Sequence, residues 1–66
     1  MDYLTSNIVY EASQAIKAMD IPEDQKDALL GYSLSNLFEA RVKRVMMKGL
    51  DVEGAISVVL THALEA

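Results

Sequence analysis

The sequence contains no cysteine and no tryptophan, and it has only one histidine and one proline. Without cysteine the chain cannot form a disulfide, a thiolate metal site or a thiol nucleophile. The single histidine, His62, has neither a histidine nor a glutamate four residues away with which to share a metal ion. The three glycines are scattered, so the sequence has no glycine-rich loop that could hold a phosphate. We therefore expect no catalytic residue, no metal site and no cofactor, and we predict that the protein is not an enzyme.

Long apolar runs are also missing from the sequence. No stretch approaches the roughly 20 consecutive apolar residues that a membrane-spanning helix needs. The first residues, MDYLTSN, are acidic rather than basic and do not lead into the apolar segment of a signal peptide. The absence of cysteine also fits a reducing compartment. We predict a cytoplasmic protein that does not enter a membrane.

The composition is that of a folded chain, with 52% hydrophobic and 24% charged residues among 66. This length corresponds to a single small domain over residues 1–66. Such a domain buries only about 60% of the surface that its unfolded chain exposes. Its stability is therefore expected to be marginal unless another chain adds to the core.

Apolar residues recur at the helical period in three segments, and no segment alternates as a strand does, so we predict an all-α fold. The first helix is expected over about 3–19, where the apolar side is made by Leu4, Ile8, Ala12, Ala15 and Met19. The third helix is expected over about 51–65, and Asp51 is a good residue to cap its N-terminus.

The middle helix is predicted to run continuously over about 22–48. Pro22 falls in its first turn, where the missing N–H group costs nothing, and Gly49 is expected to end it. The weak point is GYSLSN, residues 31–36, which lowers the helix propensity. A turn at this position is the alternative. We favour the continuous helix because the apolar face keeps its register across Gly31.

The length of this middle helix predicts a dimer. A helix over 22–48 would be about 40 Å long, whereas a compact domain of this size is about 28 Å across. One flank of the helix would stay uncovered, and a second copy related by a two-fold axis is the commonest way to cover it. We therefore predict a two-fold helical-bundle homodimer. Its candidate contact residues are Ala28, Gly31, Leu34, Ser35, Phe38, Val42 and Val45.

Positive charge is concentrated in RVKRVMMKG, residues 41–49, although the net charge of the chain is −4. One interpretation pairs this basic end of the middle helix with the acidic start of the same helix in a second copy, which the helix dipole also favours. The alternative is an anion-binding stripe, because Arg41, Arg44 and Lys48 share one side of a helix. A dimer would double that stripe. The acidic net charge argues against duplex DNA, because domains that bind it are usually strongly basic.

Two tyrosines, Tyr3 and Tyr10, lie seven residues apart and roughly opposite the apolar side of the first helix. Aromatic side chains in register away from a core indicate a contact surface. The alternative is that both rings simply lie along neighbouring side chains in water. The predicted partner-binding residues are Tyr3, Tyr10, Arg41, Arg44 and Lys48.

These observations predict a non-enzymatic helical interaction protein, a small regulator, inhibitor or adaptor that binds another macromolecule as a homo-oligomer. In length and acidic charge it resembles the helical-hairpin regulators of plasmids and phages. Its mechanism would be steric and electrostatic. One alternative is a binder of an anionic ligand, a nucleic acid or a nucleotide, that uses the doubled basic stripe. A second alternative is a structural subunit of a larger assembly.

Overall fold

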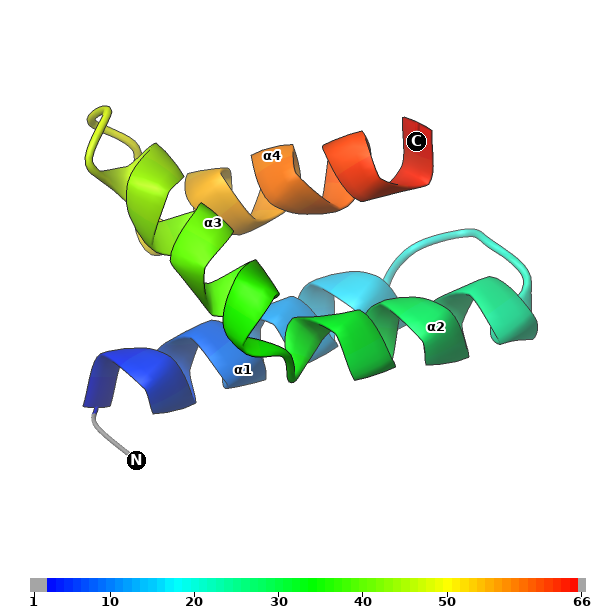
Figure 1. Ribbon diagram of the computed structural model, residues 1–66. Coiled ribbons are helices and arrows are strands. Elements are labelled where there is room, and N and C mark those ends of the chain that lie inside the picture. Colours follow the sequence, from blue (N-terminus) through cyan, green and yellow to red (C-terminus); the bar gives the residue numbers. More distant parts are fainter. Residues whose placement is uncertain (1–2, 66) are drawn as a thin grey trace.

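The computed structural model describes residues 3–65, which form four α-helices and no β-strand (Figure 1). Helix α1 spans Tyr3–Lys17, α2 spans Glu23–Ser33, α3 spans Asn36–Met46 and α4 spans Val52–Glu65. The predicted all-α class is confirmed. The prediction of three helices is wrong, because the expected middle helix is two helices.

The first and last helices lie close to where the sequence predicts them. The helix expected over 3–19 is α1, which ends two residues earlier, at Lys17. The helix expected over 51–65 is α4, and the carboxylate of Asp51 accepts a hydrogen bond of 2.8 Å from the backbone N–H of Gly54. Asp51 therefore caps α4 in the way that the sequence predicts.

The helix predicted over 22–48 is interrupted at Leu34 and Ser35. Ser35 has an extended backbone and is the N-cap residue of α3, and its Oγ accepts a hydrogen bond of 3.2 Å from the N–H of Phe38. The same hydroxyl donates a hydrogen bond of 2.6 Å to the carbonyl oxygen of Tyr32. The serine side chain thus supplies partners for backbone groups that the interruption leaves without intrahelical bonds.

Burial within one chain is the physical reason for this interruption. The change of direction after Ser35 packs α3 against α4, and the side chains of Phe38 and Val42 are completely buried. The ring of Phe38 also meets the ring of Tyr32 edge to face, with 5.2 Å between the ring centres. Full burial of a side chain of this kind is worth about 1.5–3 kcal/mol. This gain in free energy exceeds the cost of interrupting the helix at Leu34 and Ser35.

The two pairs α1–α2 and α3–α4 pack against each other, and α4 lies alongside α1 (Figure 1). Every helix contributes to the core between them. Its buried apolar residues are Ile8, Ala12, Ile16, Leu29, Phe38, Val42, Ala55, Ile56, Val59 and Leu60. The Cα atoms extend over 31 × 24 × 19 Å. No helix overshoots the domain, so the two-fold bundle homodimer that was argued from an overlong middle helix loses its basis.

Candidate functional site

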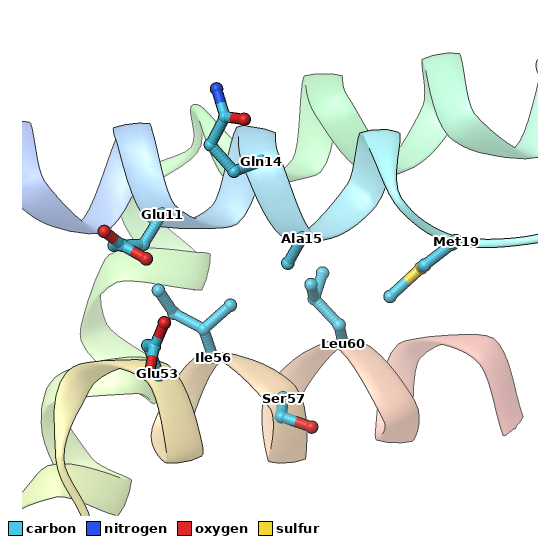
Figure 2. A pocket seen from close by; sticks show the side chains of 8 residues that line it. All are labelled: Glu11, Gln14, Ala15, Met19, Glu53, Ile56, Ser57 and Leu60. Carbon is cyan, nitrogen blue, oxygen red and sulfur yellow. The ribbon is translucent and has the colours of Figure 1, made fainter.

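A groove of about 440 Å³ lies between α1 and α4 (Figure 2). Its volume falls in the range of about 300–1,000 Å³ that is usual for ligand sites. We call it the α1–α4 groove. Its lining residues are Glu11, Gln14, Ala15 and Met19 on the α1 side and Glu53, Ile56, Ser57 and Leu60 on α4.

The α1–α4 groove has an acidic end and an apolar remainder. Figure 2 shows Glu11 and Glu53 across from each other at one end, whereas Leu60 and Met19 lie toward the other end. Within residues 3–65, neither carboxylate has a hydrogen bond or an ion pair. Two like charges that face each other favour a cation between them. The groove can therefore hold an apolar group that carries a positive charge.

The outer side of α3 forms a second candidate site. Leu37, Ala40 and Arg44 follow one another at intervals of three and four residues, which places them on one side of the helix. Met47, the C-cap residue of α3, follows three residues later with helical backbone angles. Arg41 lies beside them, and all five side chains are exposed. We call these five residues the basic α3 surface. Four of them, all but Met47, line a shallow hollow of about 260 Å³.

The basic α3 surface contains two of the three residues of the predicted anion-binding stripe. Arg41 and Arg44 lie on α3, and Nη1 of Arg41 donates a hydrogen bond of 3.1 Å to the hydroxyl oxygen of Tyr32. Lys48 lies in the turn after Met46, where α3 has ended. Within residues 3–65, none of the three cations forms an ion pair with a carboxylate. The positive charge of this surface is therefore not neutralised in the part of the chain that the structure describes.

Tyr3 and Tyr10, the other predicted partner-binding residues, are both exposed on α1, with 89% and 61% of their surfaces accessible. Neither ring has a hydrogen bond or a ring contact among residues 3–65. Neither tyrosine lines the α1–α4 groove or the hollow of the basic α3 surface. The structure thus leaves the two rings free but does not bring them together with the arginines.

The predicted oligomer-contact residues do not form one surface. Phe38 and Val42 belong to the core, so they are not exposed to a second copy. Val45 and Ser35 are partly buried within the chain. The remaining members are exposed: Ala28, Gly31 and Leu34. The prediction places all seven on one continuous helix, and the interruption at Leu34 and Ser35 divides them between α2 and α3.

Sequence reasoning missed the α1–α4 groove and its two carboxylates. A weak local signal exists, because Glu11 precedes the buried Ala12 and Glu53 lies three residues before the buried Ile56. Each carboxylate thus lies at the edge of the apolar side of its own helix. The helical pattern does not show which helices pack together, so it could not bring the two carboxylates into one groove.

Two further properties of residues 3–65 bear on the kind of site. None of their helices combines the length and the apolar character that crossing a lipid bilayer requires. These residues also hold no group of three histidine or carboxylate side chains placed to ligate a metal ion.

Comparison with known proteins adds no relative: the chain matched no family model, no curated protein and no solved structure.

Proposed function

We propose that this protein is a non-enzymatic interaction protein whose basic α3 surface binds an acidic surface of a protein. The observation that carries the proposal is the environment of Arg44. Arg44 is exposed and lines a shallow hollow with Leu37, exposed Met47 follows three residues later, and Arg44 has no carboxylate partner among residues 3–65. A partner that supplies both a carboxylate and an apolar contact would satisfy all three side chains.

The residue types on this surface suit such a contact. Arginine is enriched at protein interfaces because its planar guanidinium is weakly hydrated and binds carboxylates through two hydrogen bonds. Methionine adapts its shape to an irregular apolar surface, and 88% of the surface of Met47 is accessible. Binding would cover the partner's surface and so regulate, inhibit or connect that partner, without a chemical step.

A nucleic acid is the alternative ligand for Arg41 and Arg44, because guanidinium groups also bind phosphates. Two features favour a protein instead. The net charge of the chain is −4, which repels a polyanion at a distance. Leu37 and Met47 belong to the same basic α3 surface as Arg44 and would gain nothing from a phosphate backbone.

A photo-reactive cross-linker tests which molecule this surface contacts. Leu37 is replaced by benzoylphenylalanine in cells that make the protein, and Thr61, which is exposed on α4, is replaced in the same way as a control. We expect one acidic protein to be captured at position 37 and not at position 61. Capture of nucleic acid at position 37, or of the same proteins at both positions, would contradict the proposal.

The captured protein is then purified and its affinity is measured for two charge-reversed variants. Arg44→Glu and Lys17→Glu change the net charge equally, and both side chains are exposed, but only Arg44 belongs to the basic α3 surface. We expect Arg44→Glu to weaken binding by about tenfold or more and Lys17→Glu to change it by less than about twofold. Equal effects of the two variants would show that net charge, not this surface, governs binding.

A further inference from the structure

We infer that the acidic surface that the basic α3 surface binds is the α1–α4 groove of a second copy of the same chain. The inference rests on the proposed function and names its partner. Copies would associate head to tail, with the outer side of α3 of one copy seated in the groove of the next. This arrangement differs from a two-fold pairing, because two different surfaces meet.

Charge complementarity is the first argument for this partner. Glu11 and Glu53 face each other at the acidic end of the groove, and neither pairs with a cation within residues 3–65 (Figure 2). Arg41 and Arg44 likewise have no carboxylate partner in that part of the chain. Contact between the two surfaces would place two guanidinium groups beside two carboxylates and relieve the repulsion between like charges at both sites.

Matching spacing is the second argument. On α3, Leu37 and Arg44 are seven residues apart, and on α4, Leu60 and Glu53 are seven residues apart. At 1.5 Å per residue, both intervals correspond to about 10.5 Å along a helix. An α3 helix laid along the groove can therefore place Leu37 at the apolar end while Arg44 reaches Glu53.

Symmetry determines what such a contact builds. Each contact uses one groove and one basic α3 surface. However many copies have joined, the assembly therefore still has one unoccupied groove at one end and one unoccupied α3 surface at the other. A contact between different surfaces closes into a ring or grows into an open chain. The surfaces are small, and contacts of this size are typical of weak and transient association.

Sedimentation of charge-reversed variants tests this contact. Because the association is weak, the average mass is followed up to a protein concentration of about 1 mM. We expect the unaltered chain to exceed the mass of a dimer at high concentration. Arg41→Glu/Arg44→Glu and Glu11→Lys/Glu53→Lys are each expected to remain monomeric. An equimolar mixture of the two variants should associate again, because the intact groove of one variant meets the intact α3 surface of the other and their two reversed surfaces also carry opposite charge.

The chain that carries all four substitutions should associate again, because its two surfaces have exchanged charge. Far-UV circular dichroism checks that each variant is helical. If Glu11→Lys/Glu53→Lys does not fold, the neutral pair Glu11→Gln/Glu53→Gln replaces it and should reduce association at least tenfold. An unaltered chain that remains monomeric at the highest concentration, or variants that associate as the unaltered chain does, would overturn the inference.

Disulfide trapping locates the contact independently, because the chain has no cysteine of its own. Leu37→Cys and Ser57→Cys are mixed, since Ser57 is exposed and lines the groove. We expect the mixed disulfide to form faster than either self-paired disulfide. Equal rates for all three pairs would contradict the proposed contact.

The proposed function fails separately from this inference. If the unaltered chain stays monomeric while the cross-linker at position 37 captures a different acidic protein, the function stands and self-association is wrong. If it stays monomeric and no acidic protein is captured, both are wrong.

Discussion

Removal of one hydroxyl group tests the interruption between α2 and α3. In Ser35→Ala the N–H of Phe38 loses its acceptor and the carbonyl of Tyr32 loses a donor. Loss of an N-cap serine costs about 1 kcal/mol, within a range of about 0.5–2. Since both bonds are partly buried, we expect the free energy of unfolding to fall by about 1–2 kcal/mol.

This loss is large compared with the whole stability. At about 0.05–0.15 kcal/mol per residue, a domain of this size has a free energy of unfolding of about 3–10 kcal/mol. A loss of 1 kcal/mol lowers the melting temperature of such a domain by about 4–8 °C. Urea unfolding followed by far-UV circular dichroism measures the change, and with a slope of about 1 kcal/mol per M the midpoint should fall by about 1–2 M.

Two matched variants separate the cap from other effects. Ser35→Asp keeps a side-chain acceptor at the start of α3, so we expect a stability within about 0.5 kcal/mol of the unaltered protein. Ser57→Ala makes the same chemical change at an exposed position inside α4 and should be neutral or stabilising by up to about 0.5 kcal/mol. If Ser35→Ala behaved like Ser57→Ala, the serine would not be a cap. Its two hydrogen bonds would then contribute nothing to the stability of this turn.

Four further substitutions probe the core, the backbone and one hydrogen bond between helices. Phe38→Ala removes a completely buried ring, and we expect it to lower the free energy of unfolding by about 3–5 kcal/mol. Circular dichroism should then show that much of the protein is unfolded, whereas the milder Phe38→Leu variant should remain folded. Gly31→Ala should raise the melting temperature, because an added Cβ meets no atom within 4 Å and alanine favours a helix. Gly49→Ala should lower the melting temperature, because Gly49 has φ of +110°, which strains any residue with a side chain. Thr5→Val removes the hydrogen bond from Oγ1 to Oε1 of Glu39 that joins α1 to α3, and calorimetry should show a loss of about 1 kcal/mol; no loss would mean that water replaces this bond.

The first and last helices could be predicted from the sequence because their signals are local. The spacing of Ile8, Ala12 and Ile16 marks the buried side of α1, and Asp51 marks the start of α4. In both helices the apolar residues whose spacing predicts the helix are also buried in the core, so the sequence pattern and the burial agree.

The middle of the chain could not be predicted in the same way, because two local signals conflict there. The apolar register across Gly31 favours one helix, whereas Ser35 is a residue that favours a helix start. The outcome depends on whether Phe38 and Val42 find their cover within the chain, and this is a property of the packed structure. The prediction weighed the register more heavily and therefore expected a second chain to supply the cover.

The candidate site was partly accessible to the same reasoning. Composition and spacing identified Arg41 and Arg44, because a cluster of charge is visible in the sequence. The α1–α4 groove was not accessible, because Glu11 and Glu53 become neighbours only when the first and last helices pack together. Lys48 was assigned to the stripe because the helix was expected to reach it, and the end of α3 at Met46 removes that register.

The short connections between the helices also bear on how fast this protein folds. Two residues separate α2 from α3, and the other two turns are residues 18–22 and 47–51. The pairs α1–α2 and α3–α4 can each form from residues that are close in the sequence, and helical proteins with mostly local contacts fold in microseconds to milliseconds. The contacts of α1 with α3 and α4 are the exceptions, because they join distant parts of the chain and so carry the larger cost of loop closure. We therefore expect the rate-limiting step to be the docking of two preformed hairpins, with the groove assembled last.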